Sequence, residues 1–197
     1  MKPNIHILGI QGSGKGTQSD LLHQKYGFNT VSSGALFRTR AAQSDEFGTY
    51  LAKELAVGHL IADTHLFALV EEYLQANPIP VGFVGDGVIR TAAQYEGLQP
   101  VWKRYDLDTP LLFYLDLSDT LAIQRIENRI RQSGGQRRSD DNPEGIAARF
   151  QAYHRQTAPV ISLFEAAGRC IQIKADQSIE AIHAQIVSAI EKEYPWL

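Results

Sequence analysis

The sequence predicts an α/β fold, in which helices alternate with the strands of a parallel sheet. Short apolar runs alternate with longer amphipathic stretches, which is the pattern of consecutive β-α units. The last stretch repeats isoleucine at helical spacing and should cover one face of the sheet; its isoleucines are Ile179, Ile182, Ile186 and Ile190. A chain of 197 residues with 44% hydrophobic and 21% charged residues is in the range of one compact domain.

The predicted strands are the apolar runs Asn4–Leu8, Asn29–Ser32, Val81–Asp86, Leu111–Leu117 and Cys170–Lys174. Between the second and third runs, a helical block from Gly34 to Ala76 is about twice as long as one crossover helix needs. We therefore expect extra helices that form a cap over the sheet edge.

Residues 133–141 are polar and include adjacent glycines. Asn142 and Pro143 follow them, and these are favoured as the N-cap and the first residue of a new helix. This pattern predicts a loop or lid between two helices.

The composition excludes several classes of protein. A formal net charge of -3 argues against a general nucleic-acid binder. Cys170 is the only cysteine, so the chain forms no internal disulfide and no multi-cysteine zinc site, and we expect this residue in the core. The N-terminus does not resemble a signal peptide, and no run approaches the ~20 apolar residues that span a bilayer. We expect a soluble, cytoplasmic monomer without nucleic-acid or membrane partners.

A phosphate-binding loop is predicted directly after the first strand. Gly9, Gly12, Gly14 and Lys15 match G-x-x-x-x-G-K between a predicted strand and a predicted helix. The glycines let backbone N–H groups turn toward phosphate oxygens, and the lysine bridges the β- and γ-phosphates. The alternative is a glycine-rich turn that binds nothing, but the full context favours the P-loop of a phosphotransferase. Gly16 stands where Ser or Thr is usual, so the sequence does not assign a direct Mg²⁺ ligand there.

Further segments follow the P-loop in order: Val31–Arg38, Gly82–Arg90, Arg125–Arg129, Arg138–Asp141, Arg149 and Tyr153–Pro159. Together with Gly16-Thr17-Gln18, they resemble the adenylate kinase family of nucleoside monophosphate (NMP) kinases over nearly the whole chain. The resemblance implies a P-loop three-layer α/β fold with a five-stranded parallel sheet, a helical NMP-binding cap and a short lid. The single domain, residues 1–197, would comprise a core (1–32, 77–132 and 142–197), a cap (about 33–76) and a lid (about 133–141).

The resemblance also implies Mg²⁺-ATP-dependent phosphoryl transfer and assigns residues to it by position. The ATP-binding residues would be Gly12, Ser13, Gly14, Lys15, Gly16, Thr17, Arg125 and Gln177. The NMP-binding residues would be Ser33, Arg38, His59, Leu60, Ile61, Gly87, Arg90, Gln94, Arg138 and Arg149. The catalytic residues would be Lys15, Arg90, Arg129, Arg138 and Arg149. Asp86 would organise Mg²⁺ through water, and the short lid implies no zinc.

General chemistry agrees with this assignment. Phosphoryl transfer between two phosphates needs positioning and cationic stabilisation rather than a general base, which suits a sequence with many arginines and no Ser-His-Asp or Cys-His arrangement.

Some of these residues, taken one at a time, also have explanations that involve no binding or catalysis. Arg125 and Arg129 stand at i, i+4 and would also form a solvated basic stripe. Asp140 and Asp141 fit metal ligands, latches for nearby arginines or first-turn acids of a helix. The histidines show no metal-ligand spacing.

AMP is the expected acceptor, giving two ADP from ATP and AMP. Gln94 matches the family's adenine-reading glutamine, and Ser33 keeps the hydroxyl of the adenylate kinase threonine. The alternatives are a kinase for CMP or UMP and a non-catalytic nucleotide sensor. Val88-Ile89-Arg90 departs from the family's Phe-Pro-Arg, as Gln11 does from a P-loop proline. Because a cis bond before a non-proline residue costs about 3–4 kcal/mol, we predict a trans bond before Ile89 and a locally shifted Arg90.

Overall fold

The computed structural model describes residues 1–59, 61–135 and 141–197. The first part of the chain forms β1 (Asn4–Gly9), α1 (Lys15–Tyr26), β2 (Asn29–Ser32), α2 (Ser33–Ala41), α3 (Glu46–Ala56), α4 (Asp63–Ala76) and β3 (Phe83–Asp86). The second part forms α5 (Ala92–Arg104), β4 (Leu111–Asp116), α6 (Asp119–Gln132), α7 (Pro143–Ala152), a π-helical turn η1 (Tyr153–Thr157), α8 (Ala158–Ala166), β5 (Cys170–Lys174) and α9 (Ile179–Glu193).

The strands form one five-stranded sheet in the order β2-β3-β1-β4-β5, and every pairing is parallel. The predicted fold class is confirmed, and each predicted strand is present. β3 begins at Phe83 rather than at Val81, whose side chain is 37% exposed, and β4 ends at Asp116 rather than at Leu117. In the register, Ile7 of β1 lies opposite Asp86, so β1 and β3 end side by side.

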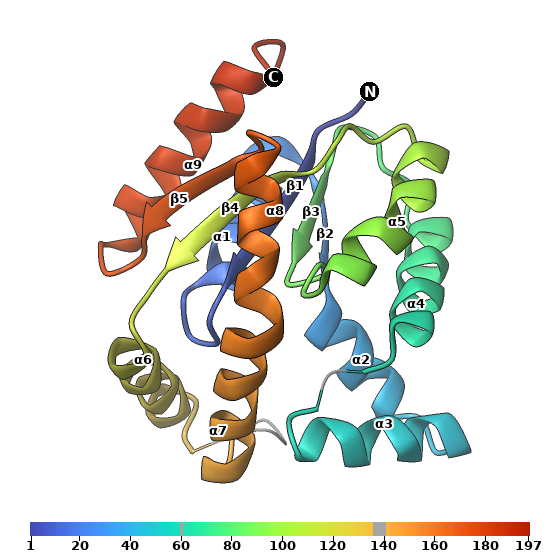
Figure 1. The fold of residues 1–197 in the computed structure, drawn as a ribbon, viewed down its shortest axis with the longest axis vertical. Helices are drawn as coiled ribbons and strands as arrows, with labels where there is room; N and C mark the ends of the chain where they lie inside the picture. The colour runs from blue at the N-terminus through green and yellow to red at the C-terminus, as the bar shows by residue number, and fades with distance from the viewer. Residues whose placement is uncertain (60, 136–140) are drawn as a thin grey trace.

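Buried side chains on the two faces of the sheet form two hydrophobic clusters. β1 illustrates the alternation, because Leu8 belongs to one cluster and Ile5 and Ile7 to the other. The first cluster takes side chains from α4, α5 and α8, and the second takes them from α1, α6 and α9. The result is three layers, with α8 crossing in front of the sheet in Figure 1.

The last helix shows a small difference from its predicted pattern. Ile182, Ile186 and Ile190 are buried in the second cluster, but Ile179 is 50% exposed because it is the first residue of α9 and lies beyond the packed face. Cys170 is half-buried at the edge of the first cluster rather than inside it, and burial raises the pKa of its thiol to about 11.

Three helices, α2, α3 and α4, fill the long interval between β2 and β3. In Figure 1, α2 and α3 lie beyond the carboxyl end of the edge strand β2, on the opposite side of the molecule from both termini. The extra helices predicted for this interval are therefore present. The division of the chain into core, cap and lid stays a prediction.

Two local predictions are confirmed. Asn142 caps α7, because its side chain accepts a hydrogen bond from Gly145 N at 2.7 Å, and Pro143 is the first helical residue. The bond before Ile89 is trans, since no peptide bond of the described residues is cis. The shift expected for Arg90 stays a prediction.

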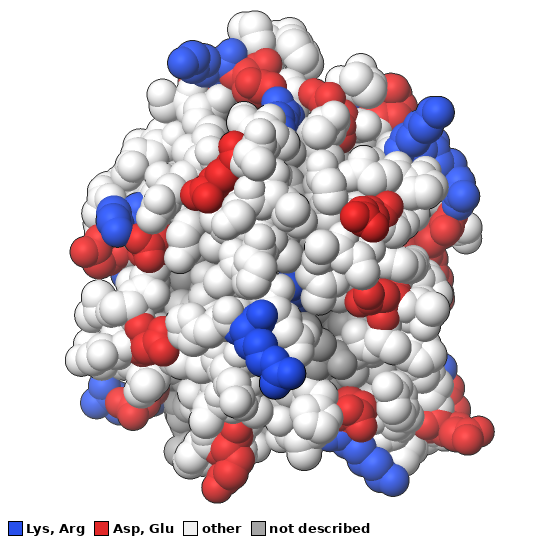
Figure 2. All heavy atoms as spheres, in the orientation of Figure 1, with Lys and Arg blue, Asp and Glu red and all other residues white. Residues whose placement is uncertain are grey.

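The distribution of charge and the length of the helices can be read directly from the structure. Basic and acidic side chains are interspersed on the face shown in Figure 2. Within the described parts of the chain, every helix is too short or too polar to cross a membrane.

Candidate active site

The P-loop joins the end of β1 to the start of α1. Gly12 has a φ of +89°, and a Cβ built there would lie 2.7 Å from the backbone oxygen of Ala122 in α6. Both the left-handed φ and the contact exclude a side chain, so glycine is required at this position. Gly14 is the N-cap of α1, and the loop therefore places the N-terminus of that helix against the cavity. The first N–H groups of a helix have no acceptor within the helix, and they lie at the positive end of the helix dipole, so this end suits an anion.

Lys15 is held over the loop by the loop's own backbone. Its Nζ donates to Gly9 O at 2.8 Å and to Ile10 O at 3.0 Å. The same side chain lines the cavity. An ammonium in this place is available for phosphate oxygens, which are stronger acceptors than carbonyls.

One cavity of about 420 Å³ joins the P-loop to residues from α2, the α3–α4 loop, the end of β3, α5, α6 and α7. The predicted residues that line it are Gly12, Gly14, Lys15, Gly16, Thr17, Ser33, Arg38, His59, Ile61, Asp86, Gly87, Arg90, Gln94, Arg125, Arg129 and Arg149. The tertiary structure thus brings residues predicted to bind ATP and residues predicted to bind the NMP to one cavity.

Four predicted residues need separate mention. Leu60 and Arg138 lie outside the described residues. Ser13 is fully buried under the loop, and its Oγ has no hydrogen-bond partner in the part of the chain that the structure describes. Gln177 lies between β5 and α9 and bonds Lys174 O and Gln185, away from the described lining of the cavity.

Three predicted NMP-binding residues, Ser33, Arg90 and Gln94, form a hydrogen-bonded network with Gly87, which we call the acceptor wall after that prediction. Ser33 Oγ donates to Gly87 O at 2.7 Å, and Arg90 Nε donates to the same oxygen at 2.9 Å. Arg90 Nη2 also lies 3.4 Å from Ser33 Oγ. The backbone N–H of Arg90 donates to Gln94 Oε1 at 2.7 Å. These bonds fix the direction of the arginine and the glutamine before any ligand arrives.

The cavity gathers several arginines near the carboxylate of Asp86. Burial lowers the pKa of Arg38; the negative charge of Asp86 opposes this, while Arg129 and Arg90 lower the pKa further. Burial also lowers the pKa of Arg90, again against the influence of Asp86. Cations that depress one another's pKa gain by taking up an anion, so the site favours phosphate groups.

Asp141 connects the P-loop to α6. Its side chain is 1% exposed, and it accepts hydrogen bonds from Arg129 Nη2 at 2.6 Å and from Gln11 Nε2 at 3.0 Å. Of the alternatives considered for this aspartate, the contacts favour a latch for a nearby arginine. They also give Gln11 a partner that a proline at the same position could not bind, because proline has no side-chain donor.

Arg125 is not part of a solvated stripe. Its guanidinium donates to Ala175 O at 2.7 Å and reaches Ser13 O at 3.5 Å, which ties α6 to the P-loop and to the end of β5. Arg129, one turn further along α6, is 35% exposed and paired with Asp141.

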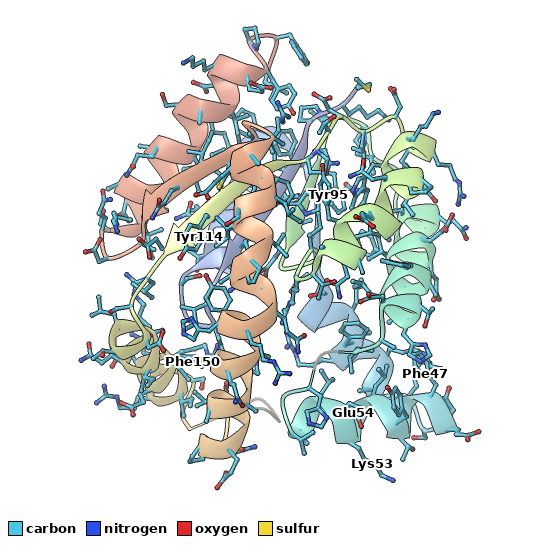
Figure 3. All side chains as sticks on the ribbon, viewed as in Figure 1. Phe47, Lys53, Glu54, Tyr95, Tyr114 and Phe150 are labelled. Carbon is cyan, nitrogen blue, oxygen red and sulfur yellow. The ribbon has the colours of Figure 1, made fainter. Side chains whose placement is uncertain are left out.

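The loop between α3 and α4 packs against α7 where both line the cavity. A Cβ built at Gly58, whose φ is +76°, would lie 2.8 Å from Gly145 O and 3.0 Å from Arg149 Cγ. Phe150, labelled in Figure 3, comes from α7 and packs in the same buried cluster as Ile126 of α6. His59 next to Gly58 is mostly exposed and pairs with Glu54 at 2.9 Å. Close packing thus brings the α3–α4 loop against the helix that bears Arg149.

Sequence reasoning missed several residues near the site, of which Asp63 and Tyr153 have the most informative contacts. Asp63 accepts a hydrogen bond from Gln94 Nε2 at 2.8 Å, and no local pattern indicates a pairing of residues 31 positions apart. Tyr153 lines the cavity, although the sequence analysis assigned it no role in binding or catalysis. Burial and a hydrogen bond with Tyr114 raise the pKa of Tyr153. The signal for Tyr153 lies in its π-helical turn, because such turns are frequent at functional sites.

Among the described residues, Asp20 and Asp86 are the carboxylates that line the cavity, and Asp86 lies close to the P-loop. A Cβ built at Gly16 would lie 3.7 Å from Asp86 Oδ2. Within the described residues, no three His, Cys, Asp or Glu side chains form a group able to hold a metal ion. One carboxylate beside a phosphate-binding loop fits Mg²⁺, which usually keeps several waters and binds substrate phosphates with one or two carboxylates.

Comparison with known proteins gives consistent matches. The family model described as adenylate kinase matches residues 7–169. The chain is 32% identical to an adenylate kinase of Hyphomonas neptunium over 189 residues, covering 96% of this chain and 98% of the relative. It is 33% identical to one of Phocaeicola vulgatus with the same coverage. It is also 33% identical to one of Bifidobacterium longum over 187 residues, covering 94% of this chain and 98% of the relative.

A P-loop at the carboxyl end of a central parallel strand, faced by arginines across one cavity, defines a P-loop phosphotransferase. The chain belongs to the adenylate kinase family. It is accordingly an enzyme that transfers a phosphoryl group from ATP to a nucleoside monophosphate.

Proposed function

We propose that this enzyme uses Mg²⁺-ATP to phosphorylate AMP, producing two ADP. The observation that carries the proposal is the single cavity whose lining includes both the P-loop and the network of Ser33, Arg90 and Gln94. An ATP γ-phosphate at the P-loop and an acceptor phosphate near Arg38 and Arg90 would share that cavity. The relatives, named adenylate kinases, support the same reaction.

Each residue of the site has a physical role in this proposal. The N-terminus of α1 and Lys15 bind the donor phosphates, and the guanidinium groups of Arg90, Arg129 and Arg149 stabilise the charge that spreads over the transferring group. The attacking oxygen belongs to a phosphate that is already ionised, so the reaction needs no base. Mg²⁺, held beside Asp86 and the phosphates, would supply further charge neutralisation.

AMP is favoured by Gln94, whose side chain is 3% exposed and whose amide can meet the edge of a base with one acceptor and one donor. A buried amide of this kind rejects bases that leave it unpaired. In the same proposal the chain acts as a cytoplasmic monomer, with residues 33–76 as the acceptor cap.

A coupled assay with Mg²⁺-ATP and a panel of AMP, GMP, CMP and UMP tests the proposal. AMP should give the highest kcat/KM. Rapid turnover of CMP or UMP without turnover of AMP would refute the choice of acceptor. Nucleotide binding without turnover of any of the four would favour the non-catalytic sensor.

A further inference from the structure

The amide of Gln94 is held at both ends by groups that differ in what they can do. Arg90 N–H donates to Oε1 at 2.7 Å, and Nε2 donates to Asp63 Oδ1 at 2.8 Å. A backbone N–H can only donate, and a carboxylate can only accept. The amide therefore cannot turn over by 180° without losing both bonds and placing like groups against each other.

With these two bonds made, each end of the Gln94 amide can form one further hydrogen bond. Oε1 keeps one lone pair, and Nε2 keeps one N–H. Their order in space is set by Asp63 and by the backbone of Arg90 rather than by Gln94 itself. Asp63 is well placed for this task, because it is the first residue of α4 and is only partly exposed.

We propose that Asp63 is a specificity-determining residue, which acts through Gln94 to admit a 6-aminopurine and to exclude a 6-oxopurine. This inference rests on the proposed function, in which Gln94 reads the acceptor base. Adenine presents a donor at N6 and an acceptor at N1, which match the free lone pair of Oε1 and the free N–H of Nε2. Hypoxanthine and guanine present an oxygen at position 6 and an N–H at N1, so both contacts would pair like with like.

The discrimination follows from the cost of unpaired groups. A site built to hydrogen-bond a substrate rejects an analogue that leaves its buried polar groups unpaired. An unrestrained glutamine would avoid that cost by turning its amide over. Asp63 prevents this rotation, because the turned amide would place Oε1 of Gln94 against the carboxylate oxygen of Asp63, and two acceptors cannot hydrogen-bond each other.

The test compares AMP with inosine 5′-monophosphate (IMP), which differs from AMP only in the groups at positions 6 and 1. Asp63→Asn replaces a pure acceptor by a group that both donates and accepts, so the amide of Gln94 can take either direction at that end. The ratio of kcat/KM for AMP to kcat/KM for IMP should fall about tenfold, which is the size expected for one hydrogen bond to a charged group. The KM for ATP at saturating AMP should change less than twofold.

The chain offers a matched control at the start of α3. Asp45 is the N-cap of that helix, accepts from Gly48 N at 2.7 Å and pairs with Arg40, away from the acceptor wall. Asp45→Asn removes the same charge and keeps a capping side chain, so the AMP to IMP ratio should stay at the wild-type value. Asp63→Ala provides a second variant, which leaves only Arg90 N–H to orient the amide and should also lower the ratio.

The outcomes are distinguishable. A lowered ratio in both Asp63 variants but not in Asp45→Asn supports the inference. Equal losses with AMP and IMP, and an unchanged ratio, would show that Asp63 only stabilises α4 and would overturn it. A wild-type enzyme that turns over CMP or UMP but not AMP would overturn the proposed function, and the inference with it.

Discussion

The two ends of the cavity are built in different ways. The proposed donor end is a contiguous loop, which offers its backbone, the N-terminus of α1 and one lysine to the cavity. The proposed acceptor end is assembled from side chains of three segments, and each is held by a hydrogen bond to another residue: Ser33 and Arg90 by the backbone oxygen of Gly87, and Gln94 by the side chain of Asp63.

This difference has a consequence for substitutions. A backbone-built site loses its function when its one charged side chain or a required glycine is removed, whatever the acceptor. A site built from side chains can be altered by substituting any of several residues. Replacing one residue that holds another in place should shift the affinity or selectivity for the acceptor without removing donor binding. The following experiments examine this contrast, from the largest expected effect to the smallest.

Lys15→Met should abolish turnover with every NMP, by a factor of at least about 10³, because it removes the only lysine of the P-loop and with it a cation at the transferring phosphate. The measurement is the coupled assay, with circular dichroism to confirm that the fold persists. Lys25→Met is the matched control on the same helix; its ammonium is 3.5 Å from Glu191 on the surface, so activity should be retained. Undiminished activity of Lys15→Met would disprove the assignment.

Arg38→Ala should affect the acceptor end alone. Arg38 lines the cavity near Arg90 and Asp86, so its loss should lower kcat/KM for AMP by about 10² while the KM for ATP changes little. Arg40→Ala, two residues along α2, removes a guanidinium that pairs with Asp45 outside the cavity and should leave both parameters near wild type. If the two variants behaved alike, the acceptor role of Arg38 would be wrong.

Asp141→Asn addresses the contact between the donor loop and α6. The variant weakens a buried carboxylate's bonds with Arg129 and Gln11, and we expect the free energy of unfolding to fall by about 1–3 kcal/mol, as measured by urea denaturation. Asp119→Asn changes an exposed aspartate that pairs with His154, and it should stay within about 0.5 kcal/mol of wild type. An Asp141 variant as stable as the Asp119 variant would contradict the latch.

His6 is a buried residue of β1, the strand that leads into the P-loop, and it lies opposite Gly85 in the register of β1 and β3. Burial lowers the pKa of its imidazole to about 3 from 6.5. The folded protein therefore holds His6 neutral, and its contribution is complete above pH 6.5 and is lost as the pH falls toward 3, because the unfolded chain takes up the proton first.

At about 1.4 kcal/mol per pH unit, this linkage should cost about 2 kcal/mol between pH 7 and pH 5. His6→Leu removes that part of the loss while leaving the acid response of other groups. The check is the difference between wild type and variant in the change of unfolding free energy over this interval. Equal changes in the two proteins would show that His6 does not titrate in this way.

The sequence predicted the fold well because its signals are local. Strand lengths, the capping residues Asn142 and Pro143, and the glycine spacing of the P-loop each depend on residues a few positions apart. The errors are at ends of elements, as at Val81 and Ile179, where exposure is decided by neighbours that the local pattern does not include.

For the candidate site, the sequence predicted a set of residues but not the hydrogen bonds between them. The P-loop, the arginines and Gln94 were found from the sequence, and most of the described ones line one cavity. Their roles stay predictions. Gln177 was placed in the site by position along the chain, but in the structure it bonds residues beyond the described lining.

The sequence by itself determined the order of elements and the donor loop, because a turn that exposes consecutive N–H groups is encoded by adjacent residues. Only the tertiary structure decided how the acceptor end is oriented and how the loop is attached to α6. Asp63 and Gln94 are 31 positions apart, and Gln11 and Asp141 are 130 apart. Such pairs meet only after the helices have packed on the sheet, so no local pattern of residues encodes them.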